Sequence, residues 1–396
     1  MEKKLKVGLF IDTFFPMIDG VIMVVDNYAR RLSSTCDVVV FAPVGRSKFD
    51  DNSLPYKVIR CKRKFPLLFL DYDLPLPKQD KSFLKAIENE HLDIVHIHSP
   101  FSIGKIGVEY AKKHNIPVVA TMHSQFKQDF KKATKSNLLT KIMLKAVMKV
   151  FNYCDECWAV NDQIARIFLE YGSKSLPKTQ NNGTEMLPYE NKAEIEKTRH
   201  SLKIENNKKI LLFIGRLTSL KNIFFIVDSL RILKDKNFSF HMIFVGTGQD
   251  EKKLEQEIER LDLKTEITLT GKISDRKEIA KYYKIADLFL FPSLYDASSL
   301  VQIEAASQKT PTLFLKGAAT AATVTEDING YVSEFSPEAY AEKIINIFKN
   351  AEHHKFVSEN AFNQLYITWD AAVKKALNDY KNIITNFNKG EKKWKI

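Results

Sequence analysis

The chain has 396 residues, of which 44% are hydrophobic and 27% are charged, and its formal net charge is +12 at pH 7. This composition excludes a disordered chain, and the length suffices for two domains of ordinary size. No apolar run approaches the ~18 residues of a membrane-spanning helix, four cysteines make no disulfide framework, and the first residues do not resemble a signal peptide. We therefore expect a protein that is cytoplasmic or peripherally bound to a membrane.

The first half of the chain alternates predicted strands with predicted helices. Short apolar runs rich in valine and isoleucine are typical of parallel strands that are covered on both faces. Such runs are found at residues 6–12, 38–42, 57–60, 94–98, 118–121 and 156–160. Helical stretches lie between them, for example at residues 21–32 and 106–114. This alternation predicts a doubly wound α/β domain over residues 1–185.

Two loops of this half could carry chemistry. Gly20 opens a predicted helix, where its amide could join a phosphate-binding nest, although it could also be a simple turn glycine. His96 and His98 lie on one face of a predicted strand, which is a spacing that could suggest a metal. The nearest acid, Asp93, falls on the opposite face of that strand, so we expect no metal site there.

Two other patterns have plainer interpretations. Asp71 and Asp73 flank a tyrosine, as in a D-x-D metal motif, but they stand between apolar residues in a loop, so we interpret them as a surface turn. Cys154 and Cys157 have no second Cys or His pair at metal-ligand spacing, so we expect ordinary half-buried thiols.

A lysine-rich segment stands out in the first half. Residues 121–151 carry seven lysines against one acid, interleaved with apolar residues at helical spacing. Such a segment could sit on an anionic membrane, or its apolar face could be core. A second basic and then apolar stretch at residues 61–70 favours the membrane, and no RNA-binding motif is present, so we expect no nucleic acid partner. The membrane or acceptor candidates are Lys127, Lys131, Lys132, Lys135, Lys141, Lys145 and Lys149.

The second half repeats the rhythm of strands and helices. Predicted strands lie at residues 210–214, 241–245, 265–269, 288–291 and 312–315, with helices between them, such as residues 222–234 and 249–260. A polar stretch between residues 180 and 208 marks the domain boundary. We expect a second doubly wound domain over residues 205–365, followed by a helix from residue 368 to about residue 386 within a basic tail, residues 366–396.

Charged residues follow two predicted strands of this second half, at the carboxyl ends where open α/β sheets bind ligands. Gly215 precedes Arg216 and Lys221, and two cations five residues apart suit a diphosphate. Asp296 and Glu304, eight residues apart, flank the start of a predicted helix. Cations at a leaving diphosphate stabilise the charge that grows in the transition state. Together these residues indicate a site for a nucleotide sugar.

These motifs resemble those of the retaining GT-B glycosyltransferases of family 4, which carry G-R-L-x4-K and Glu-x7-Glu. The chain departs from the second motif, because Asp296 replaces the first Glu and Ser298-Ser299 replaces Phe-Gly. The resemblance implies an α/β fold with two Rossmann-like doubly wound domains facing a cleft and a C-terminal helix crossing back to the first domain. The whole-chain pattern, including the His-Ile-His start, is similar to that of bacterial 1,2-diacylglycerol 3-glucosyltransferases.

The resemblance also implies roles for individual residues. Arg216 and Lys221 would hold the leaving diphosphate, and Glu304 would bind the ribose. Asp296 would contact the transferred sugar, and His123 would contact it from the opposing domain. The catalytic candidates are His123, Arg216, Lys221 and Asp296, and the donor-binding candidates are Gly20, Gly215, Arg216, Lys221, Gly246, Lys272, Ser298, Ser299, Leu300 and Glu304.

The function implied is a retaining, metal-independent hexosyltransferase without a cofactor. Its donor would be a nucleotide diphosphate sugar such as UDP-glucose, and its acceptor a lipid such as diacylglycerol, at the inner face of the cell membrane. Two alternatives remain open. The acceptor could be a polysaccharide or glycoprotein, or the chain could be a catalytically degenerate partner subunit that stabilises an active glycosyltransferase.

Overall fold

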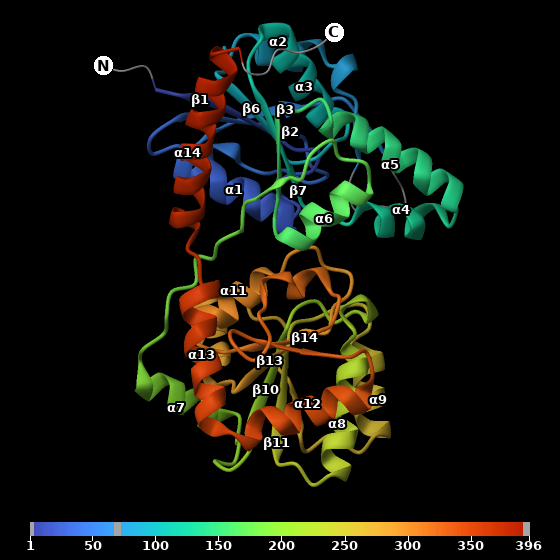
Figure 1. Cartoon of the computed structure of the whole chain (residues 1–396), viewed down its shortest axis with the longest axis vertical. Coiled ribbons are helices and arrows are strands. Elements are labelled where there is room, and N and C mark those ends of the chain that lie inside the picture. Colours follow the sequence, from blue (N-terminus) through green and yellow to red (C-terminus); the bar gives the residue numbers. More distant parts are fainter. Residues whose placement is uncertain (1–3, 67–72, 391–396) are drawn as a thin grey trace. The chain divides into compact units, whose positions relative to one another are not determined.

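The computed structural model describes residues 4–66 and 73–390, and this part of the chain forms two compact units (Figure 1). The first unit comprises Met1–Asn182 together with Trp369–Ile396, and the second comprises Gly183–Thr368. Each unit holds one parallel sheet with helices on both of its faces. The doubly wound α/β architecture that the strand and helix alternation predicts is therefore confirmed in both halves.

The sheet of the first unit has the described strand order β3-β2-β1-β6-β7-β8-β9, and all of its neighbouring strands pair in parallel. The chain winds outward from β1 in one direction and then returns to build the other side from β6. The carboxyl ends of β1 and β6 thus form the topological switch point, where such sheets bind ligands. The strands are β1 (Lys6–Phe10), β2 (Asp37–Pro43), β3 (Lys57–Cys61), β6 (Ile94–Ile97), β7 (Val118–Met122), β8 (Glu156–Ala159) and β9 (Lys178–Thr179).

Helices cover this first sheet, and a short antiparallel hairpin of β4 (Lys64–Phe65) and β5 (Leu74–Pro75) stands beside it. The amphipathic helices bury their apolar stripes against the valine-rich and isoleucine-rich strands, which are almost wholly buried. The helices are α1 (Gly20–Leu32), α2 (Lys81–Glu88), α3 (Ser102–His114), α4 (Phe126–Thr134), α5 (Asn137–Phe151), α6 (Asp162–Glu170) and α14 (Trp369–Asn388).

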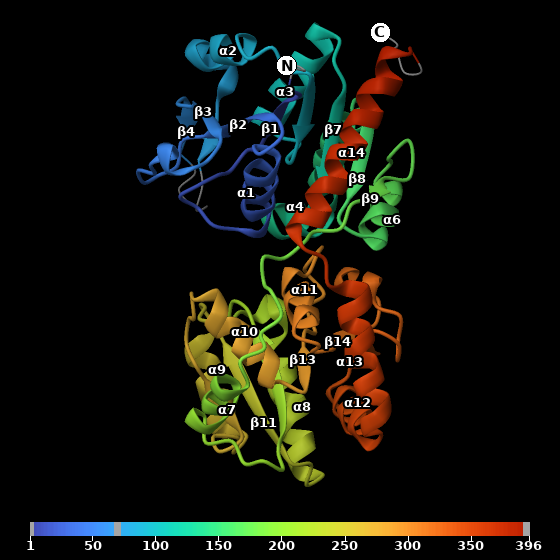
Figure 2. The same cartoon turned by 90° about the vertical axis from the view of Figure 1, so that its left-hand side faces the viewer.

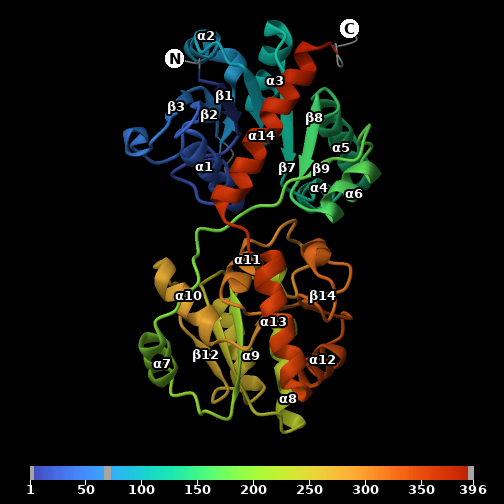
Figure 3. The same cartoon turned by 60° about the vertical axis from the view of Figure 1, so that its left-hand side comes forward.

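The last of these helices, α14, returns from the end of the second unit to the first sheet. Figures 2 and 3 both show it between α1 and β9. The buried Tyr380 hydroxyl lies 2.5 Å from Nδ1 of His96 in β6, and its ring stacks on Trp158 at 5.3 Å. Asp379 accepts hydrogen bonds from Lys178 and Gln180. The predicted terminal helix is therefore an integral part of the first unit.

The second unit repeats the plan with the strand order β12-β11-β10-β13-β14-β15, again parallel throughout, so its switch point lies between β10 and β13. The strands are β10 (Lys209–Ile214), β11 (Phe240–Val245), β12 (Ile267–Leu269), β13 (Leu288–Leu290), β14 (Thr312–Leu315) and β15 (Tyr331–Ser333). The covering helices are α7 (Lys192–Ser201), α8 (Ile223–Asp235), α9 (Glu251–Arg260), α10 (Arg276–Ile285), α11 (Leu300–Ser307), α12 (Pro337–Lys349) and α13 (Ala351–Leu365).

The sequence did not predict the shortest elements. β9 and the β4–β5 hairpin have two residues per strand, and β15 has three, too few for a recognisable period. The strand predicted at residues 265–269 is also shortened to β12. β9, β12 and β15 lie at the edges of the two parallel sheets, and β4–β5 is a separate hairpin, so the central strands, which position the candidate sites, are as expected.

Candidate active site

Two of the predicted site residues meet at the carboxyl end of the second sheet. Lys221 lies in the 3-10 turn Ser219–Lys221 that follows β10, and Asp296 lies in the loop between β13 and α11. The Lys221 ammonium contacts both carboxylate oxygens of Asp296, at 2.5 Å and 2.6 Å. The same ammonium lies 5.5 Å from the centre of the Phe291 ring. The structure thus joins two predicted site residues that are 75 positions apart.

The backbone around Lys221 explains why its side chain reaches this place. Asn222 ends the 3-10 turn in the left-handed conformation, with φ of 55°, and its side-chain amide donates to the Pro292 carbonyl at 2.7 Å. At the start of the turn, the Asp250 carboxylate accepts from the Ser219 amide at 2.7 Å. Hydrogen bonds to neighbouring loops therefore fix the turn at both ends, and neither Asn222 nor Asp250 was predicted from the sequence to belong to the site.

Gly246 has a structural reason to be glycine. Its φ is +139°, and a Cβ placed on it would lie 2.0 Å from the carbonyl oxygen of Gly215. The loop after β11 therefore presses directly on the loop after β10, and only glycine permits that approach. This contact assigns Gly246 a supporting position against Gly215.

Glu304 is held by residues that the sequence analysis missed. One carboxylate oxygen accepts from the Arg276 guanidinium at 2.5 Å, and the other accepts from the Tyr283 hydroxyl at 3.2 Å. Burial, and then the charge of Glu304, raise the pKa of Tyr283 well above its usual value. Arg276 opens α10 and gives no local signal of this partner, because the two residues meet only through the packing of α10 on α11.

Asp296 and Glu304 flank the start of a helix, as the sequence predicts. The helix α11 begins at Leu300, so Glu304 lies in its second turn. Ser299 is the N-cap, and its buried hydroxyl oxygen accepts from the Gln302 amide at 3.1 Å. A serine is a strong N-cap, and this capping starts the helix four residues before the acid. The Ser299 hydroxyl is thereby engaged within the protein.

Three further donor candidates are exposed on the surface of their units. Arg216 and Lys272 are exposed, and neither makes an ion pair with another residue of the described chain. Gly20 is also exposed and begins α1, where the Asp19 carboxylate caps the helix by accepting from the Ile22 amide at 2.8 Å. Arg216 follows β10 and Lys272 follows β12, so these cations make the carboxyl end of the second sheet suited to an anionic ligand.

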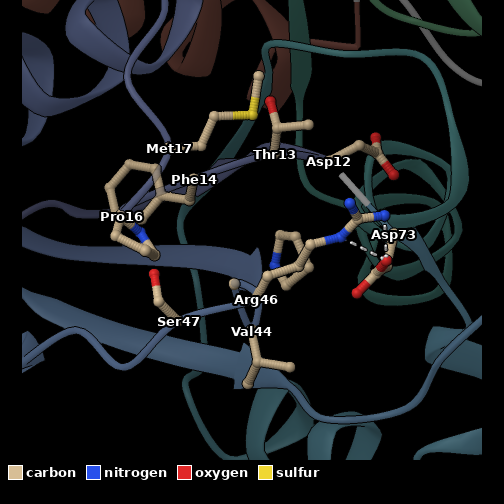
Figure 4. A pocket seen from close by; sticks show the side chains of 11 residues that line it. Asp12, Thr13, Phe14, Pro16, Met17, Val44, Arg46, Ser47 and Asp73 are labelled. Atoms are coloured by element: carbon tan, nitrogen blue, oxygen red, sulfur yellow. Dashed lines mark hydrogen bonds and ion pairs between the residues drawn. The ribbon is translucent and has the colours of Figure 1, made fainter. Parts of the chain in front are cut away.

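The first unit has a cavity of about 290 Å³ at the carboxyl ends of β1 and β2, drawn in Figure 4. Its wall combines apolar side chains such as Phe14 and Met17 with the charged Arg46. Arg46 contacts Asp73 at 2.8 Å, and Lys64 contacts the same carboxylate at 2.8 Å. The hydrogen bond from Lys64, and after it the one from Arg46, hold the pKa of Asp73 below its usual value. Asp73 is therefore an ion-paired wall residue, while the other two residues of the D-x-D pattern lie outside the described residues.

Asp12, at the end of β1, is a further residue that sequence reasoning missed. Its buried carboxylate accepts hydrogen bonds from Ser99, Ser102 and the backbone amide of Ile103, at 2.6–3.0 Å. Burial raises its pKa despite these bonds. Asp12 thus ties the end of β1 to the start of α3 and shapes the back of the cavity, a role that depends on residues about 90 positions away.

Three histidines meet at the carboxyl ends of β6 and β7. His96 is buried with both ring nitrogens bonded, to Tyr380 and to Thr121 at 2.6 Å. Nδ1 of His98 lies 3.0 Å from Nε2 of His123. Burial lowers the pKa of all three rings, that of His123 to about 3, so they are neutral at pH 7. Among the described residues, no group of three or more His, Cys, Asp or Glu side chains is arranged to hold a metal ion.

The lysine-rich segment folds into a helical hairpin of α4 and α5 at the periphery of the first unit (Figure 1). Its seven lysines are all exposed, and none is ion-paired within the described residues. The carboxyl half of α5 buries Val147, Met148, Val150 and Phe151. The amino half exposes Leu138, Leu139 and Ile142, to 69%, 49% and 55%. The core interpretation is therefore confirmed for the carboxyl half of α5, while the amino half presents apolar side chains on the surface.

The cysteine pair behaves as expected from its spacing. Cys154 and Cys157 are free thiols, partly buried, and each donates a weak hydrogen bond to a backbone carbonyl at 3.4–3.5 Å. Burial raises the pKa of Cys154 well above its usual value, which makes it a poor nucleophile.

Comparison with known proteins identifies the two halves. Residues 18–183 match Glycosyltransferase Family 4, and residues 194–364 match Glycosyl transferases group 1. The alpha-monoglucosyldiacylglycerol synthase of Acholeplasma laidlawii is 25% identical over 381 residues, covering 90% of this chain and 92% of that protein. The synthase of the same name from Streptococcus pneumoniae is 25% identical over 320 residues, covering 78% of this chain and 70% of that protein.

The fold has close parallels among solved structures. The Anabaena protein HepE, solved in complex with UDP, superimposes with a TM-score of 0.76 at 15% identity, over 96% of this chain and the whole of that chain. At that identity the likeness establishes a shared fold. Within the described residues, no helix is both long and apolar enough to cross a bilayer.

Proposed function

This chain is a GT-B glycosyltransferase, with a family 4 half followed by a group 1 half, and from that premise we propose that it is a retaining glucosyltransferase. It would move glucose from UDP-glucose to a hydroxyl of diacylglycerol while bound to the cytoplasmic face of the cell membrane. Two relatives named alpha-monoglucosyldiacylglycerol synthase, aligned over most of the chain, support the choice of sugar and acceptor.

The observation that carries the lipid acceptor is the exposed amino half of α5. Leu138, Leu139 and Ile142 stand in water beside lysines that have no acidic partner among the described residues. A soluble acceptor gives no reason to expose three large apolar side chains on one helix end. An anionic bilayer offers both apolar depth for these side chains and phosphate charge for the lysines. Each lysine near such a surface contributes on the order of 1 kcal/mol.

The second unit would hold the donor. Arg216 and Lys221 would bind the diphosphate, and Lys272 would add positive charge to the site. Glu304 would accept hydrogen bonds from the ribose hydroxyls. When the diphosphate takes Lys221, the Asp296 carboxylate would accept hydrogen bonds from hydroxyls of the glucose. Side-chain cations would thus supply the charge stabilisation for which other glycosyltransferases use a metal ion, and no cofactor would be needed.

The cavity of the first unit would accept the polar end of the acceptor. Its apolar wall, with Phe14 and Met17, suits the glycerol carbons and the start of an acyl chain. Its Arg46 guanidinium can donate to an ester or hydroxyl oxygen. A volume of about 290 Å³ admits a glycerol backbone and leaves the acyl tails outside, in the bilayer.

The transfer step follows from these roles. The acceptor hydroxyl oxygen would form a bond to the anomeric carbon as the bond from that carbon to the β-phosphate oxygen breaks. The bonding electrons would leave with UDP, held by Arg216 and Lys221. The hydroxyl proton would pass to the departing phosphate oxygen on the same face of the sugar, which retains the anomeric configuration. His123 would contact the transferred sugar, as the family resemblance implies.

The test uses the full chain with UDP-glucose and phosphatidylglycerol vesicles, with and without diacylglycerol. We expect UDP release and an α-linked glucolipid only when diacylglycerol is present. Parallel reactions with GDP-mannose and with UDP-galactose test the sugar and the base. Turnover of a soluble sugar acceptor without vesicles would refute the lipid acceptor, and binding without turnover of any donor would favour the degenerate subunit.

A further inference from the structure

His98 makes a direct contact with the candidate catalytic residue His123. Nδ1 of His98 lies 3.0 Å from Nε2 of His123, and the two rings are nearly parallel, with centroids 5.3 Å apart and planes inclined by 18°. His98 follows β6 and His123 follows β7, which are paired neighbours in the first sheet. The sheet itself therefore sets the distance between the two rings.

The ring of His98 is fixed in place. The edge of the Tyr28 ring approaches it at 5.8 Å, and the His96 ring lies against it at 4.0 Å. His96 cannot move aside, because both of its nitrogens are hydrogen-bonded. The His98 backbone amide also donates to the Phe10 carbonyl at 2.8 Å. His98 thus offers His123 one nitrogen at a constant position.

The other nitrogen of His98 decides which ring donates. Nε2 of His98 is buried and has no hydrogen-bond partner within residues 4–66 and 73–390. Burial keeps the ring neutral, so it carries a single N–H. If the proton were on Nε2, a buried donor would be orphaned, which folded proteins avoid more strictly than an orphaned acceptor. The proton therefore belongs on Nδ1, which faces His123.

We propose that His98 is a positioning residue that sets the tautomer of His123. Nδ1–H of His98 donates to Nε2 of His123, so the single proton of neutral His123 sits on its Nδ1. That Nδ1 makes no hydrogen bond to another described residue and is not a buried atom, so it is available to a ligand. His123 consequently acts as a hydrogen-bond donor to an oxygen of the bound sugar, and it does not act as a base. The sugar contact rests on the proposed function.

Nitrogen-15 NMR of the histidine rings in the full-length protein tests the tautomer directly, without any substrate. We expect His123 in the wild type to show a protonated Nδ1 and an unprotonated Nε2 between pH 6 and pH 8. Replacement of His98 by phenylalanine keeps a ring but removes the donor, and it should give His123 a mixture of tautomers. In His98→Asn the side-chain amide stands at the place of Nδ1 and should restore the wild-type tautomer.

Kinetics with UDP-glucose and diacylglycerol vesicles provide the second readout. We expect His98→Phe to lower kcat about 10-fold to 100-fold, because a misdirected contact is lost in the transition state, with little change in KM for UDP-glucose. His98→Asn should recover most of that loss, and His200→Asn, at an exposed histidine of the second unit, should leave the His123 tautomer unchanged. A wild-type His123 protonated on Nε2, or an unaltered tautomer in His98→Phe, would refute the proposal. A wild type that transfers no glucose would refute the proposed function and leave the tautomer result standing.

Discussion

Lys221 and Asp296 form a two-pronged ion pair, with the ammonium 2.5 Å and 2.6 Å from the two carboxylate oxygens, in the site assigned to the donor. Both side chains are partly exposed, Lys221 to 17% and Asp296 to 19%. The cation proposed to bind the diphosphate is therefore neutralised before the donor arrives. Under the proposed function, a donor phosphate would replace the carboxylate at Lys221, and Asp296 would then contact the sugar hydroxyls.

Removal of Asp296 should have opposite effects on binding and on transfer. In Asp296→Ala, Lys221 is free, so UDP without a sugar should bind up to about 5-fold more tightly, since a partly exposed pair is worth at most about 1 kcal/mol. Glucose transfer should fall about 100-fold, because the sugar hydroxyls lose the carboxylate that accepts their hydrogen bonds. Isothermal titration with UDP and initial rates with UDP-glucose measure the two effects.

A variant of Lys221 and a control variant at another ion-paired lysine complete this test. Lys221→Met should weaken UDP binding and lower kcat/KM about 100-fold to 1000-fold. Lys316→Met is the control, because Lys316 also follows a strand of the second unit and is also ion-paired, at 2.6 Å to Glu334. Unchanged or weaker UDP binding by Asp296→Ala would contradict the proposed exchange.

The apolar end of α5 should be required for vesicle binding. The triple variant Leu138→Gln, Leu139→Gln, Ile142→Gln should reduce partition onto phosphatidylglycerol vesicles at least about 10-fold, since each side chain loses on the order of 1 kcal/mol of apolar burial. Co-sedimentation measures the partition. The folded protein should keep its circular dichroism spectrum, because these residues are exposed.

A control of similar exposure lies in the other unit. Leu187, Ile328 and Phe335 are also large, exposed apolar residues, and their replacement by glutamine should not alter vesicle binding. Equal losses in both triple variants would mean that general hydrophobicity, and not the α5 end, controls membrane affinity.

Two lysines of the last turn of α4 and the C-cap Lys135 should contribute through charge. Replacing Lys131, Lys132 and Lys135 by glutamine should weaken binding to anionic vesicles by about 3 kcal/mol at low salt, or on the order of 100-fold. The difference from wild type should shrink as salt rises, because screening weakens the attraction. Glutamine at Lys252, Lys253 and Lys277, which are exposed lysines of the second unit, provides the charge-matched control.

The α14 helix should depend on one buried hydrogen bond. Tyr380→Phe leaves Nδ1 of the buried His96 without its partner, so the free energy of unfolding should fall by about 1–3 kcal/mol. Urea denaturation of both proteins measures the difference. Tyr366→Phe should cost much less, because no hydrogen bond of the Tyr366 hydroxyl is found among the described residues. Equal stability of wild type and Tyr380→Phe would contradict this role.

The buried histidines should make the protein acid-sensitive. Burial lowers the pKa of His96, His98 and His123 in the folded state, so the unfolded chain binds more protons once the pH falls below its ordinary value of about 6.5. Their stabilising contribution is complete above that pH. It is lost as the pH falls toward the folded-state pKa, by up to about 1.4 kcal/mol per pH unit for each ring.

The unfolding free energies of wild type and His98→Asn, measured at pH 7, 6 and 5, give the contribution of the His98 ring to the pH dependence of stability. The variant should lose less stability between pH 6 and pH 5, by roughly the 1.4 kcal/mol that one proton contributes per pH unit. His200→Asn, at an exposed histidine, should follow the wild type. A wild type whose stability does not decline between pH 6 and pH 5 would contradict the neutral, buried state of the cluster.

The central strands and their covering helices could be predicted because their signal is local. A run such as residues 210–214 is apolar at every position, as a strand buried on both faces must be, and its identity needs no knowledge of distant residues. The cations Arg216 and Lys221 were visible for the same reason, since they follow such a run directly. β9 and β15 were missed because two or three residues carry no period, and their neighbours in the sheet define them.

The sequence by itself determined the two doubly wound halves, the donor motif and the excess of lysine between residues 121 and 151. Only the tertiary structure decided which side chains meet. The pairs Lys221–Asp296, Arg276–Glu304 and His98–His123 join residues 25 to 75 positions apart. It also decided which half of α5 is core and which is exposed. The physical reason is that periodicity is a property of residues that are close together in the sequence, whereas side-chain pairing and burial depend on how whole helices and strands pack.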